Sequence, residues 1–166
     1  MAETYKIRPM LWFDGQAEEA AKFYVSVFPN SKILEVARYG DTGPGKKGSV
    51  MTVAFRLGDQ EYVALNGGPQ FKFTEAISLA IEVETQEEID RLWKALTSNG
   101  GQEGPCGWLK DRWGLSWQVT PSALIRAVGG PDQKKADRAM AAMMDMKKID
   151  LKRIEAAIRG GAAGLT

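Results

Sequence analysis

Apolar and polar side chains follow two different periods along the first half of the chain. Alternation over Tyr5–Phe13 indicates a strand, and apolar residues at helical spacing predict a helix over Gln16–Phe28. Alternation returns in three further segments that we interpret as strands, Lys32–Tyr39, Ser49–Leu57 and Glu61–Leu65. The first half therefore has the order strand, helix and three strands.

The second half follows the same order. Ile77–Val83 alternates as a strand. Thr85 is followed three residues later by Glu88, a capping box that predicts the start of a helix. Short strands are expected at Gly107–Lys110 and Leu115–Thr120.

A shift of 69 residues lays the first half over the second. Phe23-Tyr24 then meets Leu92-Trp93, and Glu18-Glu19 meets Glu87-Glu88. Such a repeat indicates two similar modules, each too small to close a core alone. We predict an α+β fold in which two repeated βαβββ modules form a curved mixed sheet around a cleft.

A helical segment follows the two modules. Ala136–Lys147 is amphipathic and rich in alanine and methionine, and Asp150 can cap a short last helix. The expected boundaries are 1–128 for the domain, with modules at 5–70 and 75–121, and 129–160 for a C-terminal helical extension.

Composition excludes several classes of function. The chain has no histidine, so Ser-His-Asp triads and imidazole-ligated metal sites cannot form within it. Lys plus Arg is 22 and Asp plus Glu is 21, so no charge excess favours a nucleic-acid partner. One cysteine, no apolar run long enough for a bilayer and no signal-peptide pattern predict a cytoplasmic protein without a membrane partner.

Three motifs resemble one known family. Phe13–Tyr24 is similar to the opening F-x-G-x-A-x-E-A-x-x-F-Y, Leu65–Phe71 to the segment LNGGP-x-F, and Cys106–Gln118 to the closing CGWLKD-x-x-G-x-SWQ. With the helical segment Asp132–Ala157, they resemble the PhnB-like branch of the vicinal-oxygen-chelate superfamily, the group of glyoxalases, bleomycin-resistance proteins and extradiol dioxygenases. The resemblance implies the paired βαβββ fold and a homodimer.

Members of this branch are often described as 3-demethylubiquinone-9 3-methyltransferase-like. Methyl transfer from S-adenosylmethionine usually uses a Rossmann-like sheet with a glycine-rich turn between a strand and a helix. The glycine-rich stretch Gly43–Gly48 lies between two predicted strands instead. The residues therefore give that activity little support.

In metal-dependent members of the superfamily, four ligands, usually His and Glu, come from the first and last strand of each module. The resemblance carries these positions to Pro9, Ser78 and Gln118, and to either Leu65 or Asn66. None is a carboxylate, thiolate or imidazole, so we expect no metal and no cofactor. An alternative is a metal enzyme that uses other carboxylates, such as Glu61, Glu75 or Asp111.

The vacated positions indicate a small-molecule pocket. Pro9, Leu11 and Phe13 would share a face with Ser78, Ala80 and Glu82 by strand alternation. The predicted ligand-binding residues are Pro9, Leu11, Phe13, Asn66, Ser78, Trp108, Trp117 and Gln118. Asn66 and Gln118 could instead satisfy strand ends, and the tryptophans could be core or dimer contacts.

Two residues are candidates for a reactive group. Glu82 could be a buried general base, or it could be a solvated residue at a strand end. Cys106 stands near Lys110 and Arg112 and could be a reactive thiol, or it could be a packed cysteine in a turn.

The resulting hypothesis is a metal-independent small-molecule binding protein of unknown ligand. The alternative is an enzyme of the same fold with a non-standard site: a lyase, a dioxygenase or, as the family description suggests, a methyltransferase.

Overall fold

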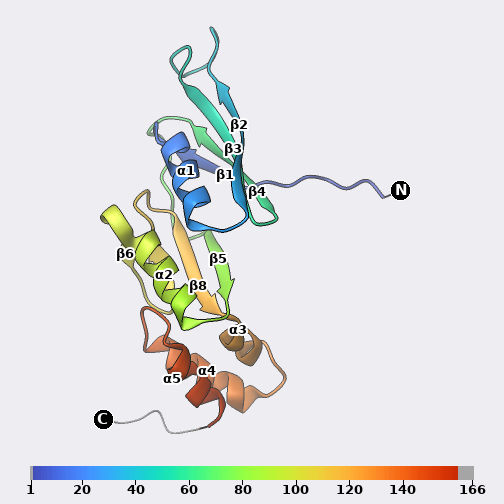
Figure 1. Ribbon diagram of the computed structural model, residues 1–166, viewed down its shortest axis with the longest axis vertical. Coiled ribbons are helices and arrows are strands. Elements are labelled where there is room, and N and C mark those ends of the chain that lie inside the picture. The colour runs from blue at the N-terminus through green and yellow to red at the C-terminus, as the bar shows by residue number, and fades with distance from the viewer. Residues whose placement is uncertain (1, 161–166) are drawn as a thin grey trace. The chain divides into compact units, whose positions relative to one another are not determined.

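A computed structural model of the chain describes residues 2–160. It divides into two compact units, Met1–Lys72 and Phe73–Thr166, which Figure 1 colours from blue to red along the chain. Within residues 2–160, no helix combines the length and the apolar character that crossing a bilayer requires.

The first unit is a four-stranded sheet with one helix. Its elements are β1 (Met10–Phe13), α1 (Ala17–Val27), β2 (Ser31–Arg38), β3 (Val50–Leu57) and β4 (Gln60–Asn66). The strand order is β1-β4-β3-β2. β1 runs parallel to β4, and the other neighbours are antiparallel.

Helix α1 covers one face of this sheet, as Figure 1 shows. Tyr24 on α1 stacks on Phe55 of β3, with ring centroids 6.1 Å apart. Leu11 and Phe13 of β1 point the same way and are buried. The side chains of Met10 and Trp12 lie on the opposite face, because successive residues of a strand alternate.

The first strand is shorter than the sequence predicted. It begins at Met10 rather than Tyr5, and Tyr5 and Ile7 are 82% and 83% exposed. The carbonyl of Pro9 still accepts a hydrogen bond from Val63 N at 3.0 Å. Pro9 has no N–H to continue the ladder, so the pairing ends there despite the alternating pattern.

The second unit repeats the arrangement. Its sheet elements are β5 (Ser78–Val83), α2 (Gln86–Thr97), a short 3₁₀ turn (Ser98–Gly100), β6 (Gln102–Glu103), β7 (Trp108–Lys110) and β8 (Ser116–Pro121). The strand order β5-β8-β7-β6 matches that of the first unit, with β5 parallel to β8. The predicted α+β fold with two βαβββ modules is confirmed, whereas β6 is too short for a sequence period and was not located.

Helix α2 packs its predicted apolar stripe on the second sheet. Ile89, Leu92, Trp93 and Leu96 are buried. The predicted cap at the start of this helix is confirmed, because Thr85 Oγ1 accepts from Glu88 N at 3.2 Å. The Glu88 carboxylate in turn accepts from Glu84 N at 3.3 Å, one residue before the position that a capping box uses.

Three further helices belong to the second unit: α3 (Ser122–Val128), α4 (Gln133–Met144) and α5 (Leu151–Ile158). They share a core cluster of Leu124, Ala127, Ala139, Met146, Ile149 and Ile154. The sequence pattern gave no helix at α3, because its seven residues form barely two turns and Pro121 at its start provides no side-chain cap.

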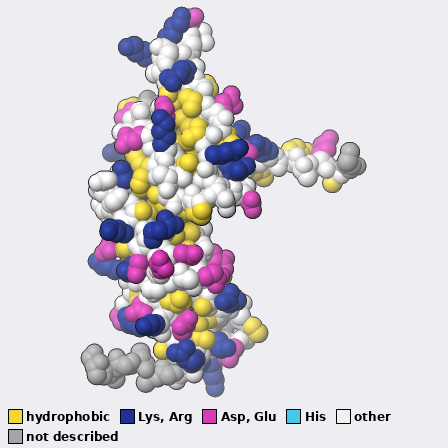
Figure 2. Space-filling view, viewed as in Figure 1, with side chains coloured by type: hydrophobic (Ala, Val, Ile, Leu, Met, Phe, Trp, Pro, Cys, Tyr) yellow, Lys and Arg dark blue, Asp and Glu magenta, His cyan; other side chains and the backbone are white. Residues whose placement is uncertain are grey.

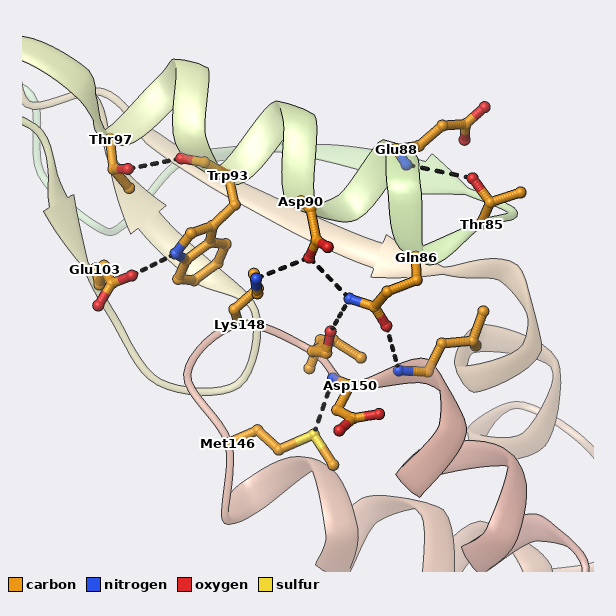
Figure 3. Close-up of polar contacts among 12 residues, drawn as sticks. Thr85, Gln86, Glu88, Asp90, Trp93, Thr97, Glu103, Met146, Lys148 and Asp150 are labelled. Carbon is orange, nitrogen blue, oxygen red and sulfur yellow. Dashed lines mark hydrogen bonds and ion pairs between the residues drawn. The ribbon is translucent and has the colours of Figure 1, made fainter.

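Within the second unit, Gln86 at the start of α2 connects that helix to the C-terminal helical extension (Figure 3). Its amide donates to Ile149 O at 3.0 Å and accepts from Leu151 N at 2.8 Å. Next to it, Lys148 forms an ion pair of 2.7 Å with Asp90. The extension is therefore held to α2 by polar contacts as well as by its own apolar core.

Candidate functional site

The face of the second sheet opposite α2 carries a row of polar side chains. The strand registers pair Gln102 with Lys110, Lys110 with Ser116, and Ser116 with Ser78. Paired residues of neighbouring strands point to the same side. The four side chains thus form one line across all four strands, which we call the polar row.

The middle of the polar row holds an unusual hydroxyl. Ser116 is 1% exposed, and among the described residues its Oγ has no hydrogen-bond partner. A buried hydroxyl without a partner is unfavourable by about 1–3 kcal/mol. This cost marks Ser116 as a place where an additional polar group would be favourable.

The neighbours of Ser116 in the row are both engaged. The Lys110 ammonium forms an ion pair with the Glu75 carboxylate. The hydrogen bond that Lys110 donates to this carboxylate is the largest cause that holds the pKa of Glu75 below its ordinary value, ahead of the positive charge of the ammonium. On the other side, Ser78 Oγ accepts from Gln118 Nε2 at 2.9 Å.

A cavity of about 430 Å³ opens at this face. Most of its surface is apolar, and its volume falls in the range of small-molecule sites. Its lining consists of Glu75, Gln102, Glu103, Gly104, Pro105, Cys106, Trp108, Leu109, Lys110 and Ser116, all from the second unit.

Glu103 borders the cavity but directs its side chain elsewhere. Its register partner Leu109 is buried on the α2 side of the sheet. Its carboxylate accepts from Trp93 Nε1 of α2 at 2.6 Å, as Figure 3 shows. Glu103 therefore supports the helix, and Glu75 is the carboxylate that meets the polar row.

The structure brings four of the predicted site residues together. Ser78, Trp108 and Gln118 lie on the same face of the second sheet, where Trp108 pairs with Gln118. Cys106 lines the cavity, with its Sγ 3.6 Å from Met144 Sδ. Lys110 and Ser116 were not among the predicted site residues.

Two other predicted residues of the second unit lie elsewhere. Trp117 is buried on the α2 side, where its Nε1 donates to Asp111 Oδ2 at 2.9 Å. Glu82 shares the face of the polar row but is solvent-exposed, which removes the burial on which its role as a base depended.

The pocket residues predicted in the first unit require a correction. Leu11 and Phe13 are each 3% exposed and pack in the core beneath α1, so they do not line an accessible face. Pro9 precedes β1 and contributes its carbonyl to Val63. The strand face available in β1 is that of Met10 and Trp12.

This inversion arises from the loop before each helix. Three residues separate β1 from α1, whereas two, Glu84 and Thr85, separate β5 from α2. The shift of 69 therefore matches the helices, but the strands match at 70, which aligns Phe13 with Val83. A slip of one residue exchanges the two faces of a strand.

Asn66 has a structural role at the end of β4. Its Oδ1 accepts from Ala17 N at 2.9 Å, and its Nδ2 donates to Val50 O at 3.1 Å. It thereby satisfies the first turn of α1, whose own cap residue makes no side-chain hydrogen bond. Asn66 faces the helix side, and Leu65, the alternative position, faces the opposite side with Trp12.

A second cavity of about 430 Å³ lies in the first unit, lined by glycine-rich segments that include Gly67, Gly68 and Pro69. Tyr39 at its border donates its hydroxyl to Asn66 O at 2.6 Å. Gly67 allows a close approach, because a Cβ there would lie 2.3 Å from the Trp12 ring. Gly67 is therefore explained by packing against Trp12, and Gly68, whose carbonyl accepts from Trp12 Nε1 at 2.8 Å, by its backbone φ of +102°.

The three carboxylates considered as alternative metal ligands are each engaged otherwise. Glu61 pairs with Lys6 at 2.5 Å, and Glu75 pairs with Lys110. Asp111 accepts from Trp113 N, Leu115 N and Trp117 Nε1. Within residues 2–160, no three His, Cys, Asp or Glu side chains gather closely enough to hold a metal ion.

On the face of the molecule that Figure 2 shows, the charged side chains do not indicate a second kind of site. Figure 2 shows Lys and Arg side chains interspersed with Asp and Glu over the visible face. No large region of one sign is present on that face to attract a polyanion.

Comparison with known proteins adds the family. The family model described as 3-demethylubiquinone-9 3-methyltransferase matches residues 5–120. The PhnB protein from Bacillus cereus is 38% identical, with a TM-score of 0.63 over 71% of this chain and 100% of its own. A search of curated proteins gave no match.

More distant structures share the fold alone. A protein from Pseudomonas aeruginosa is 22% identical, with a TM-score of 0.59 over 71% of this chain and 98% of its own. The fosfomycin resistance protein FosX from Listeria monocytogenes, determined with Mn(II), is 12% identical, with a TM-score of 0.51 over 72% of this chain and 92% of its own. Given the match over residues 5–120 and the similarity to the PhnB protein, the chain belongs to the PhnB-like 3-demethylubiquinone-9 3-methyltransferase family.

Proposed function

We propose that this protein binds a small organic molecule in the cavity of its second unit and does so without a metal ion. The observation that carries the proposal is the buried Ser116 hydroxyl, which has no hydrogen-bond partner within residues 2–160 and lines a largely apolar cavity. An apolar lining with a few convergent polar groups is the usual form of a ligand pocket.

The donor set of the polar row supports binding without a metal. Ser78, Ser116 and Gln118 offer only neutral oxygens, and Lys110 brings a positive charge to the same face. Of the two carboxylates nearby, Glu75 pairs with Lys110, and Glu82 is solvent-exposed. Divalent metals are held by carboxylates, imidazoles or thiolates, and an ammonium nearby repels them. The residues present on this face therefore do not fit a metal centre of the kind that the superfamily uses.

The enzyme alternative has less support. The only thiol, Cys106, touches Met144 rather than a base, and Glu82 is exposed. The glycine-rich segment 43–48 connects β2 to β3, not a strand to a helix as in Rossmann-like methyltransferases. We also propose that the protein is a cytoplasmic homodimer without nucleic-acid or membrane partners. The family resemblance supports the homodimer, and the balanced charge argues against a nucleic-acid partner.

Native mass spectrometry of the full chain, purified without chelators, tests both parts of the proposal. We expect no stoichiometric divalent metal. We also expect an uncharged aromatic probe, 3-phenylpropanamide, to bind the wild type and to bind Trp108→Ala about tenfold more weakly, because Trp108 lines the cavity.

Trp113→Ala is the matched control. Trp113 stands in the turn before β8, stacks under Arg112 at 5.1 Å, and does not line the cavity. Probe binding that is equal in both variants would place the ligand elsewhere. A stoichiometric divalent metal retained by the protein would overturn the proposal that it binds its ligand without a metal ion.

A further inference from the structure

The polar row consists of groups that donate hydrogen bonds. Gln102 offers an amide, Lys110 an ammonium and Ser116 a hydroxyl, all on one face of neighbouring strands. Cβ atoms of directly paired residues are about 4.5–5.5 Å apart, so a single small group can touch two members. Such a line of donors is complementary to an oxyanion.

The position of an oxyanion on this row is already occupied from within the chain. Glu75 belongs to the irregular segment that precedes β5, and its carboxylate forms the ion pair with Lys110. Its side chain is 59% exposed, whereas that of Lys110 is 38% exposed. Glu75 can therefore turn to solvent at little cost, since exposed ion pairs contribute little to stability.

Glu75 does not complete the row, because no described residue hydrogen-bonds to the Ser116 hydroxyl beside the Glu75–Lys110 pair. A ligand carboxylate on Lys110 could reach both groups. The rest of such a ligand would meet Pro105, Trp108 and Leu109, which are apolar. The second carboxylate at the border, Glu103, is directed to Trp93 and does not oppose an anion on the row.

We propose that the cavity binds apolar monocarboxylates, whose carboxylate replaces Glu75 on Lys110 and accepts a hydrogen bond from Ser116. This inference rests on the proposed function and names its ligand class. Glu75 then acts as an internal competitor that occupies Lys110 when no ligand is bound.

The consequence is a specific pattern among variants. Glu75→Gln removes the competing charge, so it should tighten carboxylate binding by about two- to fivefold. Lys110→Met removes the counter-ion and should weaken it by about tenfold or more. Ser116→Ala removes a single donor and should weaken it by about three- to tenfold.

The experiment is calorimetric titration of the full-length protein with 3-phenylpropanoate and with its neutral isostere 3-phenylpropanamide. The wild type should prefer the carboxylate by about tenfold. Glu75→Gln and Lys110→Met should shift carboxylate affinity in opposite directions and leave amide affinity unchanged. Lys94→Met, which removes an exposed ammonium from the last turn of α2, is the charge-matched control and should change neither affinity.

Equal affinity for the two probes, or a Glu75→Gln variant that binds the carboxylate no better than wild type, would overturn the inference. Amide binding that depends on Trp108 would survive that result and would leave the proposed function standing. Carboxylate binding that falls equally in Lys94→Met and Lys110→Met would also overturn it, because the effect would then come from net charge.

Discussion

The two sheets have the same strand order but different chemistry on the face opposite their helix. In the first sheet, this face carries Met10, Trp12, Val63 and Leu65. In the second sheet, the corresponding strands β5 and β8 carry Ser78, Ser116 and Gln118 on this face. The helix-facing sides, by contrast, are mainly apolar in both units.

The comparison shows that the residues facing the helices stabilise the fold in both units, whereas the residues on the opposite faces differ between them. Burial beneath α1 and α2 requires apolar residues at the same places in both modules, so that part of the sequence repeats. The opposite faces are free of that requirement, and there the repeat is lost. The polar face of the second unit is therefore the better candidate for function, and the first unit serves as its internal control.

The largest effect is expected at Asp111, in the hairpin turn between β7 and β8. Its buried carboxylate accepts from two backbone N–H groups and from Trp117 Nε1. Asp111→Ala leaves these donors without an acceptor and should lower the free energy of unfolding by about 3 kcal/mol or more. Urea denaturation followed by tryptophan fluorescence measures the change.

The corresponding hairpin of the first unit provides the comparison for Asp111. Asp59 lies in the tight turn between β3 and β4 and is exposed. Asp59→Ala should stay within about 0.5 kcal/mol of wild type. Similar losses in the two variants would show that the buried hydrogen bonds of Asp111 contribute little.

The next prediction concerns two ways in which a backbone N–H group in the first turn of a helix finds a hydrogen-bond acceptor. Helix α2 is capped by its neighbour Thr85, whereas α1 is satisfied from β4 by Asn66. Asn66→Ala loses two hydrogen bonds and should cost about 2 kcal/mol, while Thr85→Ala loses one and should cost about 1 kcal/mol. Thermal unfolding of both variants gives the order.

An Asn66→Ala variant as stable as wild type would argue against the structural role of this amide. Asn66 would then be free to orient a ligand, as the sequence alone allowed. The expected result instead assigns it to the first unit's architecture.

The fold was predictable because its signals are long and repeated. The stripes of α1 and α2 match at one shift, and the cap at Thr85 is visible in the sequence. The start of β1 was placed too early, because alternation does not reveal that Pro9 ends the hydrogen-bond ladder.

The site was less predictable, for two physical reasons. One additional residue before α1 exchanged the faces of β1, so Leu11 and Phe13 were placed in a pocket instead of the core. The strands β6 and β7 span two and three residues, too few to show a period that would reveal the polar row. The turn at Asp111 was a usable signal, since a hairpin there sets Lys110 opposite Ser116.

The smallest expected effect is the loss of stability in acid, and it should be similar in the two units. A lysine partner lowers the pKa of Glu18 and Glu61 in the first unit and of Glu75 and Asp90 in the second. For Asp90, the hydrogen bond from Lys148 is the largest cause and that from Gln86 is the second.

A carboxyl whose folded pKa lies below its unfolded value stabilises the protein above the unfolded value. That contribution disappears as the pH falls through the folded pKa. The melting temperature should therefore be flat between about pH 5.5 and 7.5, because the chain has no histidine, and should decline below about pH 4.5. These four carboxyls should account for a decline of a few degrees at most, since all four lie at the surface.

Calorimetry from pH 7.5 to pH 3 measures this profile, and Asp90→Asn sharpens it. The variant removes one of the two carboxyls of the second unit whose pKa is lowered by a lysine partner, so its melting temperature should depend less on pH below about 4.5 while the neutral plateau changes little. A melting temperature that changes between pH 7.5 and 6 would contradict this expectation. A protein without histidine has no side chain whose unperturbed pKa lies in that range.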